Sequence, residues 1–202
     1  MNERNGEASR ALIAAAEDYV ARLFADNAGG HDVGHTLRVR RNAMRIAAEE
    51  PECDALIVEL AALLHDADDD KLFHTEHNAN ARRFLEREGV APERIERICA
   101  AVNSVSFSKN RGIRPETLEG QIVQDADRLD AIGAVGIARC FAFGGEHGRQ
   151  MEESVQHFYD KLLRLTGEMN TMSAKRLART RHAFLELFLK EYGEETGADR
   201  EN

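Results

Sequence analysis

The stretch Ala61–Asp66, AALLHD, indicates how the whole chain folds. It closes an apolar run over residues 56–64, interrupted only by Glu59, and ends abruptly in His65-Asp66. Apolar residues on every face of this run predict a helix buried in the middle of a domain. A His and an Asp at the end of such a helix lie where an isolated charge is costly, and a bound cation or a salt bridge would relieve that cost.

Length and charge limit the classes of protein that fit. A chain of 202 residues suits one domain, or one domain with a small appendage, and can bury a core without disulfides. The net charge is −9, with Lys and Arg scattered between acids, which argues against a nucleic-acid polymer as partner. A small phosphorylated substrate remains compatible, since a bound metal would supply positive charge.

Cysteine use and hydropathy indicate the compartment. Cys53, Cys99 and Cys140 form no CxxC pair, so a zinc finger or redox motif is not indicated. The polar start MNERNGEASR lacks the apolar segment of a signal peptide, and no apolar run approaches membrane-spanning length. These features predict a cytoplasmic protein with no membrane partner.

Apolar residues recur at helical spacing along nearly the whole chain, and no alternating pattern lasts long enough to indicate a strand. We therefore predict an all-α fold in a single domain over residues 1–202, with a core at about 26–143 and C-terminal helices at about 154–192 packed on it. The helices are expected at about 7–26, 32–50, 55–66, 75–88, 92–102, 117–143, 154–165 and 173–192.

Two glycines, Gly133 and Gly136, fall inside the expected 117–143 helix, where each costs roughly 1 kcal/mol relative to Ala. We interpret them as sites of close packing against another helix. The stretch GGEHGR at residues 144–149 is interpreted as a loop.

Four residues that are far apart in the chain are candidate metal ligands: His35, His65, Asp66 and Asp127. His35 shares one helical face with Val39 and other apolar residues, so it points inward. Imidazole nitrogens with carboxylate oxygens suit Mn, Fe, Ni, Co or Zn better than Ca or Mg. A divalent ion makes bound water acidic enough to attack phosphorus near neutral pH. Hydrogen-bonded core histidines and a capping Asp would explain the same residues, and spacing alone leaves both interpretations open.

Three longer stretches carry a family resemblance: HDVGHTLRV at 31–39, AALLHD at 61–66 and IVQDADRLDAIGAVGIAR at 122–139. Together they resemble the HD superfamily of metal-dependent phosphohydrolases, whose pattern is an early His, an HD pair and a distal Asp. That pattern maps onto His35, His65-Asp66 and Asp127 without departure. The phrases VSFSKN, GGEHGR and MNT, with the extended Asp127 phrase, resemble the bacterial YedJ/YpgQ-like branch over about residues 26–192.

The resemblance implies an all-α HD-domain helical fold, one metal ion held by the four side chains, and hydrolysis at phosphorus. For the branch it implies a nucleotide pyrophosphohydrolase that cleaves a nucleoside triphosphate (dNTP or NTP) between its α and β phosphates. Manganese is the metal that the branch implies, while Mg, Ni, Co, Fe and Zn stay open.

Two carboxylates are assigned catalytic roles. Asp66 is a metal ligand at the reaction centre, and Asp69, three residues later, is expected to orient the attacking water or act as general base. The alternative is that Asp68, Asp69 and Asp70 form a solvated acidic loop.

Four further residues are candidate substrate contacts: His31, Lys71, Lys109 and Arg128. Long basic side chains on loops can close over an anion. Each has an ordinary alternative, such as a solvated loop or, for Arg128, an ion pair with a neighbouring acid. Asp32 is interpreted as a helix cap.

The leading hypothesis is a metal-dependent phosphohydrolase acting on a nucleotide or similar small metabolite. A phosphomonoesterase or a cyclic-nucleotide phosphodiesterase on the same site is an alternative. A non-catalytic regulator that binds a metal or nucleotide belongs to a second class. The C-terminal helices would pack within the monomer or against a second copy, so a homodimer stays open.

Overall fold

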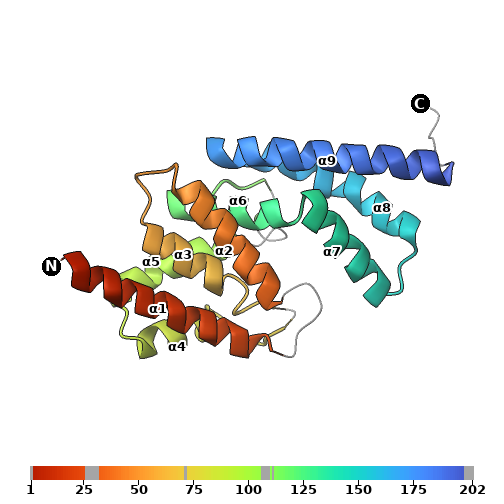
Figure 1. Cartoon of the computed structure of the whole chain (residues 1–202). Coiled ribbons are helices and arrows are strands. Elements are labelled where there is room, and N and C mark those ends of the chain that lie inside the picture. The colour runs from red at the N-terminus through yellow and green to blue at the C-terminus, as the bar shows by residue number, and fades with distance from the viewer. Residues whose placement is uncertain (1, 26–31, 71, 106–109, 111, 198–202) are drawn as a thin grey trace. The chain divides into compact units, whose positions relative to one another are not determined.

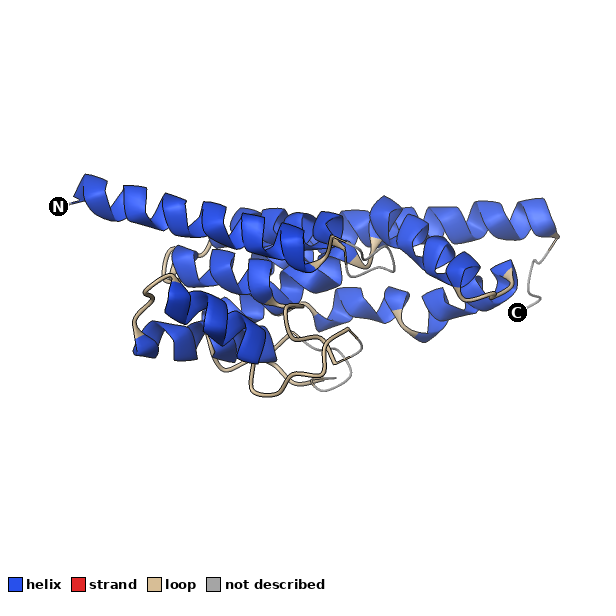
Figure 2. Ribbon diagram, turned by 90° about the horizontal axis from the view of Figure 1, so that it is seen from below, coloured by secondary structure: helices blue, strands red, loops and turns tan. Residues whose placement is uncertain are grey.

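The computed structural model describes residues 2–25, 32–70, 72–105, 110 and 112–197. Over these residues the regular elements are helices and no strand is found (Figure 2), which confirms the all-α prediction. The chain divides into two compact units, residues 1–127 and 128–202. The expected single domain, with C-terminal helices packed on its core, stays a prediction.

The first unit is built around one central helix, α3. This helix packs against α1, α2 and α5, while α4 packs on α5 (Figure 1). Its apolar side chains Ile57, Val58 and those of residues 60–64 are buried, as the sequence predicts. The helices of this unit are α1 (Asn2–Leu23), α2 (Val33–Ala47), α3 (Ala55–Leu64), α4 (Ala79–Arg87), α5 (Pro92–Asn103) and α6 (Leu118–Asp130), which continues to the first residues of the second unit.

Capping residues define the starts of the two helices that frame the site. Asp32 accepts a hydrogen bond from the main-chain N–H of His35 at 2.6 Å, which confirms that Asp32 caps α2. Asp54 likewise caps α3 by accepting from the N–H groups of Leu56 and Ile57. These caps fix where each helix begins, and therefore which turn carries each candidate ligand.

The helix expected from residue 75 begins four residues later, at Ala79. His77 and Asn78 both have left-handed backbone conformations, with φ of 57° and 58°. A right-handed helix cannot run through two such residues, so the start expected at Thr75-Glu76 was wrong.

The helix expected over residues 117–143 is two helices, α6 and α7 (Gly133–Glu146). The chain breaks at Ile132, which is extended, and at Gly133, whose φ is +75°. A Cβ on Gly133 would lie 3.0 Å from Arg181 of α9, so Gly133 serves both the turn and close packing. A Cβ on Gly136 would lie 2.2 Å from the carbonyl oxygen of Ala131, which is backbone of the turn itself rather than another helix.

The second unit contains α7, α8 (Met151–Asp160), the 3-10 helix η1 (Leu162–Glu168) and α9 (Met172–Thr196). α7 packs on α8 and α9, and η1 packs on both α8 and α9 (Figure 1). Phe141, Phe158 and Phe188 form its aromatic centre, with ring centroids 5.6–5.9 Å apart. The loop expected at residues 144–149 was partly wrong, because α7 continues through Gly144 and Gly145, and α8 starts at residue 151 instead of 154.

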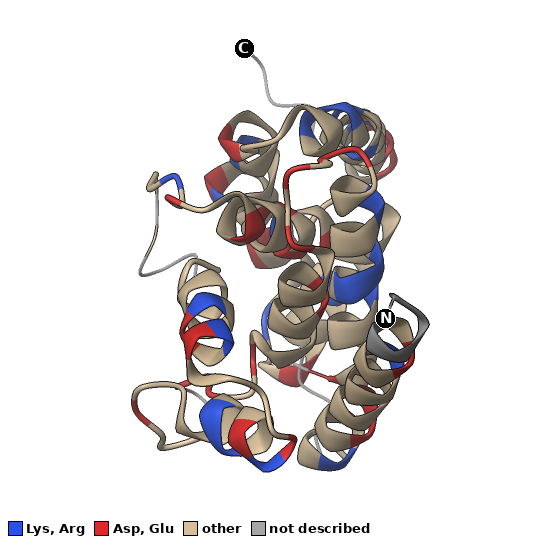
Figure 3. Ribbon diagram, turned by 90° about the vertical axis from the view of Figure 1, so that its left-hand side faces the viewer, with Lys and Arg blue, Asp and Glu red and all other residues tan. Residues whose placement is uncertain are grey.

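Acidic and basic residues are interspersed along most helices on the face seen in Figure 3. The fold offers no candidate for a bilayer span, since no helix among the described residues is both long enough and apolar enough to cross one.

The turn between α6 and α7 yields a stability prediction. Gly136→Ala would force a Cβ against the Ala131 carbonyl, and overpacking of this kind typically costs about 1–3 kcal/mol. Gly145→Ala is the matched control, because a Cβ there meets nothing within 4 Å and Ala is the better helix former. Denaturant unfolding should show a lowered midpoint for Gly136→Ala only; equal midpoints for the two variants would contradict this account.

Candidate metal centre

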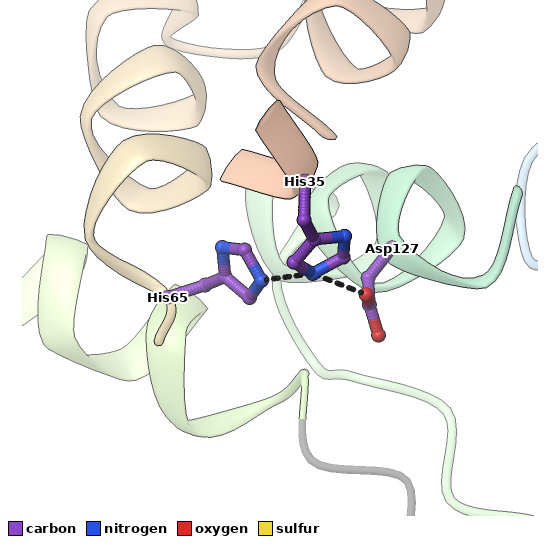
Figure 4. Close-up of side chains that lie close together, drawn as sticks. All are labelled: His35, His65 and Asp127. Carbon is purple, nitrogen blue, oxygen red and sulfur yellow. Dashed lines mark hydrogen bonds and ion pairs between the residues drawn. The ribbon is translucent and has the colours of Figure 1, made fainter. Parts of the chain in front are cut away.

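His35 lies in the first turn of α2 with its imidazole pointing into the first unit (Figure 4). Only 2% of this residue is exposed. The Asp32 cap sets the helix start three residues earlier, so the ring points toward the apolar interior shared with Val39.

His65 lies at the C-terminal end of the buried helix α3, where the apolar run stops. Its Nδ1 is 2.9 Å from the carbonyl oxygen of Ala62. A carbonyl oxygen can only accept, so Nδ1 carries a hydrogen and the ring orientation is fixed. Nε2 of His65 then lies 3.2 Å from Nε2 of His35, with the two rings edge to face.

Two carboxylates meet these imidazoles. Oδ2 of Asp66 is 3.2 Å from Nε2 of His65 and 3.4 Å from Nε2 of His35. Oδ1 of Asp127, on α6, is 3.4 Å from Nε2 of His35 (Figure 4). The Asp127 side chain is 28% exposed, compared with 2% for each imidazole, so the cluster is open to solvent on the side of Asp127.

Two buried amides hold α6 at the site, and the sequence analysis did not single them out. Nδ2 of Asn42 donates to the carbonyl oxygen of Ala126, next to Asp127, at 3.2 Å. Nε2 of Gln124 donates to the carbonyl oxygen of Ser104 at 2.8 Å. Asn42 lies seven residues after His35 and Gln124 three before Asp127, and these helical spacings were the available signal.

The donor atoms are suitable for a cation. Ligand atoms of His35, His65 and Asp127 lie within 4.8 Å of one another, the one such group among the described residues. Asp66 is not a member of that group of three, although its carboxylate faces both imidazoles. Two nitrogens and nearby carboxylate oxygens form a mixed N/O donor set that divalent transition metals accept.

The electrostatics of the metal-free cluster are dominated by its carboxylates. Burial by itself would lower the pKa of His65. The charge and hydrogen bond of Asp66, with Asp127 and the Ala62 carbonyl, outweigh burial and raise the pKa of His65 from 6.5 to about 9. In the metal-free cluster, the proton on His65 therefore supplies positive charge that partly balances the nearby carboxylates.

Only some of the other predicted site residues are described by the structure. His31, Lys71 and Lys109 lie outside the described residues. Asp69 is partly buried; its main-chain N–H donates to the Asp66 carbonyl at 3.1 Å.

Arg128 is 5% exposed in the second unit, where its guanidinium donates to the Glu168 carbonyl oxygen and lies 3.4 Å from the Glu168 carboxylate. Arg128 therefore has an acidic neighbour as partner, which is the alternative raised for it, and its substrate role stays a prediction.

The acidic segment after α3 is not wholly solvated. Asp70 is exposed, but the Asp68 carboxylate accepts from the main-chain N–H groups of Asn80 and Ala81 at 2.9 and 3.0 Å. For Asp68, the alternative of a solvated acidic loop therefore does not hold.

Comparison with known proteins identifies the family of this chain. The chain belongs to the HD domain family, whose pattern matches residues 32–132. It is 41% identical over 182 residues to the protein YpgQ of Bacillus subtilis, covering 86% of this chain and 88% of that one.

Solved structures show the same likeness. The crystal structure of B. subtilis YpgQ in complex with ADP superposes with a TM-score of 0.80 at 33% identity, covering 93% of this chain and 96% of that one. An HD-superfamily hydrolase from Bacillus thuringiensis gives a TM-score of 0.77 at 35% identity, covering 95% and 100%. These likenesses support a hydrolase.

The cluster makes a prediction about the metal-free protein. In chelator-treated protein, the His65 ring is expected to titrate near pH 9. Because the folded state binds this proton more tightly than the unfolded state, its stabilising contribution is complete below about pH 6.5 and is lost as pH rises through about 9. NMR titration of the ring protons measures the pKa directly. Asp66→Asn should lower it, whereas the exposed Asp70→Asn should leave it unchanged; a wild-type value at or below 6.5 would contradict the prediction.

Proposed function

We propose that this protein is a metal-dependent phosphohydrolase, in which His35, His65, Asp66 and Asp127 hold one divalent cation. The observation that carries the proposal is the meeting of side chains from α2, the end of α3 and α6. The motif resemblance maps the HD pattern onto these four residues, all of which lie within the matched range 32–132.

For the cation we propose manganese, the metal that the resemblance to the YedJ/YpgQ-like branch implies. The mixed N/O donor set is equally compatible with Fe, Co, Ni or Zn, and Mg stays an alternative. When bound, the cation would supply Lewis-acid activation of water and neutralise charge on a phosphate oxygen. The protein's own contribution is to orient the ligands: Ala62 fixes the His65 ring, and Asn42 fixes the α6 backbone beside Asp127. Burial of both imidazoles keeps bulk water away from the inner side of the site, while the more exposed Asp127 leaves room for substrate to approach.

Asp69 is proposed to orient the attacking water or accept its proton. It follows Asp66 by three residues and is partly buried. Its main-chain N–H donates a hydrogen bond to the Asp66 carbonyl oxygen. A carboxylate that follows a ligand residue this closely in the chain is a candidate general base.

For the substrate, we propose a nucleoside triphosphate (dNTP or NTP) cleaved between its α and β phosphates. The crystal structure of YpgQ is a complex with ADP, and it matches 93% of the present chain. This likeness supports a nucleotide as the substrate. The same site would serve a phosphomonoesterase or a cyclic-nucleotide phosphodiesterase, and a chain that binds nucleotide without turnover would be a regulator.

Ligand variants test the metal assignment. Loss of a group that only hydrogen-bonds a metal ligand typically costs about 10–100-fold in metal affinity or activity, so His65→Ala or Asp66→Ala should cost at least about 100-fold in both. The exposed His74 provides the matched control, and His74→Ala should retain both. Elemental analysis and manganese titration report binding, while phosphate release reports turnover. Unchanged turnover in His65→Ala, with metal supplied, would falsify the assignment.

Product identity tests the reaction. Wild-type protein with manganese and a nucleotide panel should release pyrophosphate and a nucleoside monophosphate in equal amounts from a triphosphate. Orthophosphate from a monophosphate would indicate a phosphomonoesterase, and ring opening would indicate a cyclic-nucleotide phosphodiesterase. Tight nucleotide and metal binding with no product from any substrate would support the regulator instead.

A further inference from the structure

The start of α4 is capped by a residue from another part of the chain. The two oxygens of the Asp68 carboxylate accept from the main-chain N–H groups of Asn80 and Ala81, at 2.9 and 3.0 Å. These amides belong to the first turn of α4, which has no hydrogen-bond acceptors inside the helix. A carboxylate there is also favoured by the positive end of the helix dipole. The cap therefore comes from Asp68, ten residues before the residue at the usual capping position, Asn78.

Asn78 does not cap the helix itself. It is left-handed and buried, and its side chain makes no capping hydrogen bond. His77 is left-handed as well, and its carbonyl oxygen accepts from Nε of Arg82 at 2.9 Å. Consecutive left-handed residues other than glycine are unfavourable and persist only where surrounding contacts hold them. Arg82 makes such a contact with His77, and Asp68 holds the helical turn that follows Asn78.

The connection to the segment after α3 is reciprocal. While Asp68 accepts from Asn80, Nδ2 of Asn80 donates to the carbonyl oxygen of Ala67 at 2.9 Å. The helix is in turn held by α1, because the Tyr19 hydroxyl donates to the Asn80 carbonyl oxygen and the Tyr19 ring stacks on Phe84 at 4.7 Å. Residues 67 and 68 are thus bound to a helix start that is itself well supported.

In the chain, Asp68 lies between Asp66 and Asp69, the two carboxylates that have roles in the proposed reaction. Asp66 faces the imidazoles of His35 and His65, while Asp68 is turned to α4. Asp69 follows directly, and its main chain donates to the Asp66 carbonyl and accepts from Phe73 at 2.8 Å. A displacement of about 1 Å at a reacting group can cost about 100-fold in rate. The position of Asp69 therefore depends on where residue 68 is held.

We propose that Asp68 is a positioning residue for the hydrolytic site, which fixes Asp69 and the Asp66 carbonyl by capping α4. This inference rests on the proposed function. It distinguishes three adjacent acids: Asp68 anchors the segment, Asp69 acts on water, and Asp70 is exposed and has no role in the proposal.

The test compares Asp68→Ala and Asp68→Asn with Asp70→Asn in the full-length, manganese-loaded protein. Hydrogen exchange at the Asn80 and Ala81 amides measures the cap. Steady-state kinetics with a nucleoside triphosphate measures kcat and KM, and manganese titration measures metal affinity. Asp68→Ala should speed exchange at both amides and lower kcat about 10–100-fold, with KM and metal affinity within about threefold of wild type. Asp68→Asn keeps one oxygen acceptor and should fall between Asp68→Ala and wild type, while Asp70→Asn should match wild type.

A second control separates positioning from loss of stability. Thr171 caps α9 in the second unit by accepting from the Ala174 N–H at 3.2 Å. Thr171→Ala removes a helix cap without touching the segment after α3, so kcat should not change at a temperature where all variants are folded. Asp69→Asn should lower kcat while leaving exchange at Asn80 and Ala81 at the wild-type rate.

The outcomes are distinct. If wild type turns over nucleotide but Asp68→Ala keeps wild-type kcat, Asp68 is only a structural cap and the inference is overturned. Unchanged exchange at Asn80 and Ala81 in Asp68→Ala would overturn it as well. If wild type itself yields no product from any nucleotide, the proposed function fails, and the positioning role fails with it.

Discussion

The burial of His65 and Asp66 at the end of an apolar helix is the constraint on which the first unit depends. α3 packs against α1, α2 and α5, so its C-terminal end lies where water cannot solvate a charge freely. The imidazole and the carboxylate must therefore find partners within the protein. His35 and Asp127 supply them from helices that precede and follow α3 in the chain.

Polar contacts with the backbone give this cluster its shape. The Ala62 carbonyl orients the ring of His65, and the Asn42 amide holds the carbonyl next to Asp127. Neither residue is a metal ligand in the proposal, yet each sets the direction of one. The raised pKa of His65 has the same origin, since carboxylates gathered around a buried imidazole favour its charged form. A cluster that favours a proton in this way also favours a cation in its place.

The parts of the fold that sequence reasoning missed share one cause. Hydrophobic spacing extends a helix wherever apolar residues continue, so it carried one helix through residues 117–143, and the local start signal Thr75-Glu76 placed another helix start four residues too early. The breaks come from backbone conformation: Gly133 is left-handed, and so are His77 and Asn78. For Gly133 the residue type permitted a turn. For His77 and Asn78 no local pattern reveals the conformation: Arg82 contacts the His77 carbonyl, and Asp68 holds the helical turn that follows Asn78.

By itself, the sequence determined the all-α class, the buried character of α3 and the capping role of Asp32, because helical periodicity and capping are local properties of neighbouring residues. It also indicated His35, His65, Asp66 and Asp127 as a set. Only the tertiary structure decided that these side chains meet, that Asn42 and Gln124 hold α6 beside them, and that Asp68 caps α4 instead of facing solvent. Contacts of this kind join residues from 12 positions apart, for Asp68 and Asn80, to 92 positions apart, for His35 and Asp127. Such pairings depend on how helices pack rather than on any stretch of the chain alone.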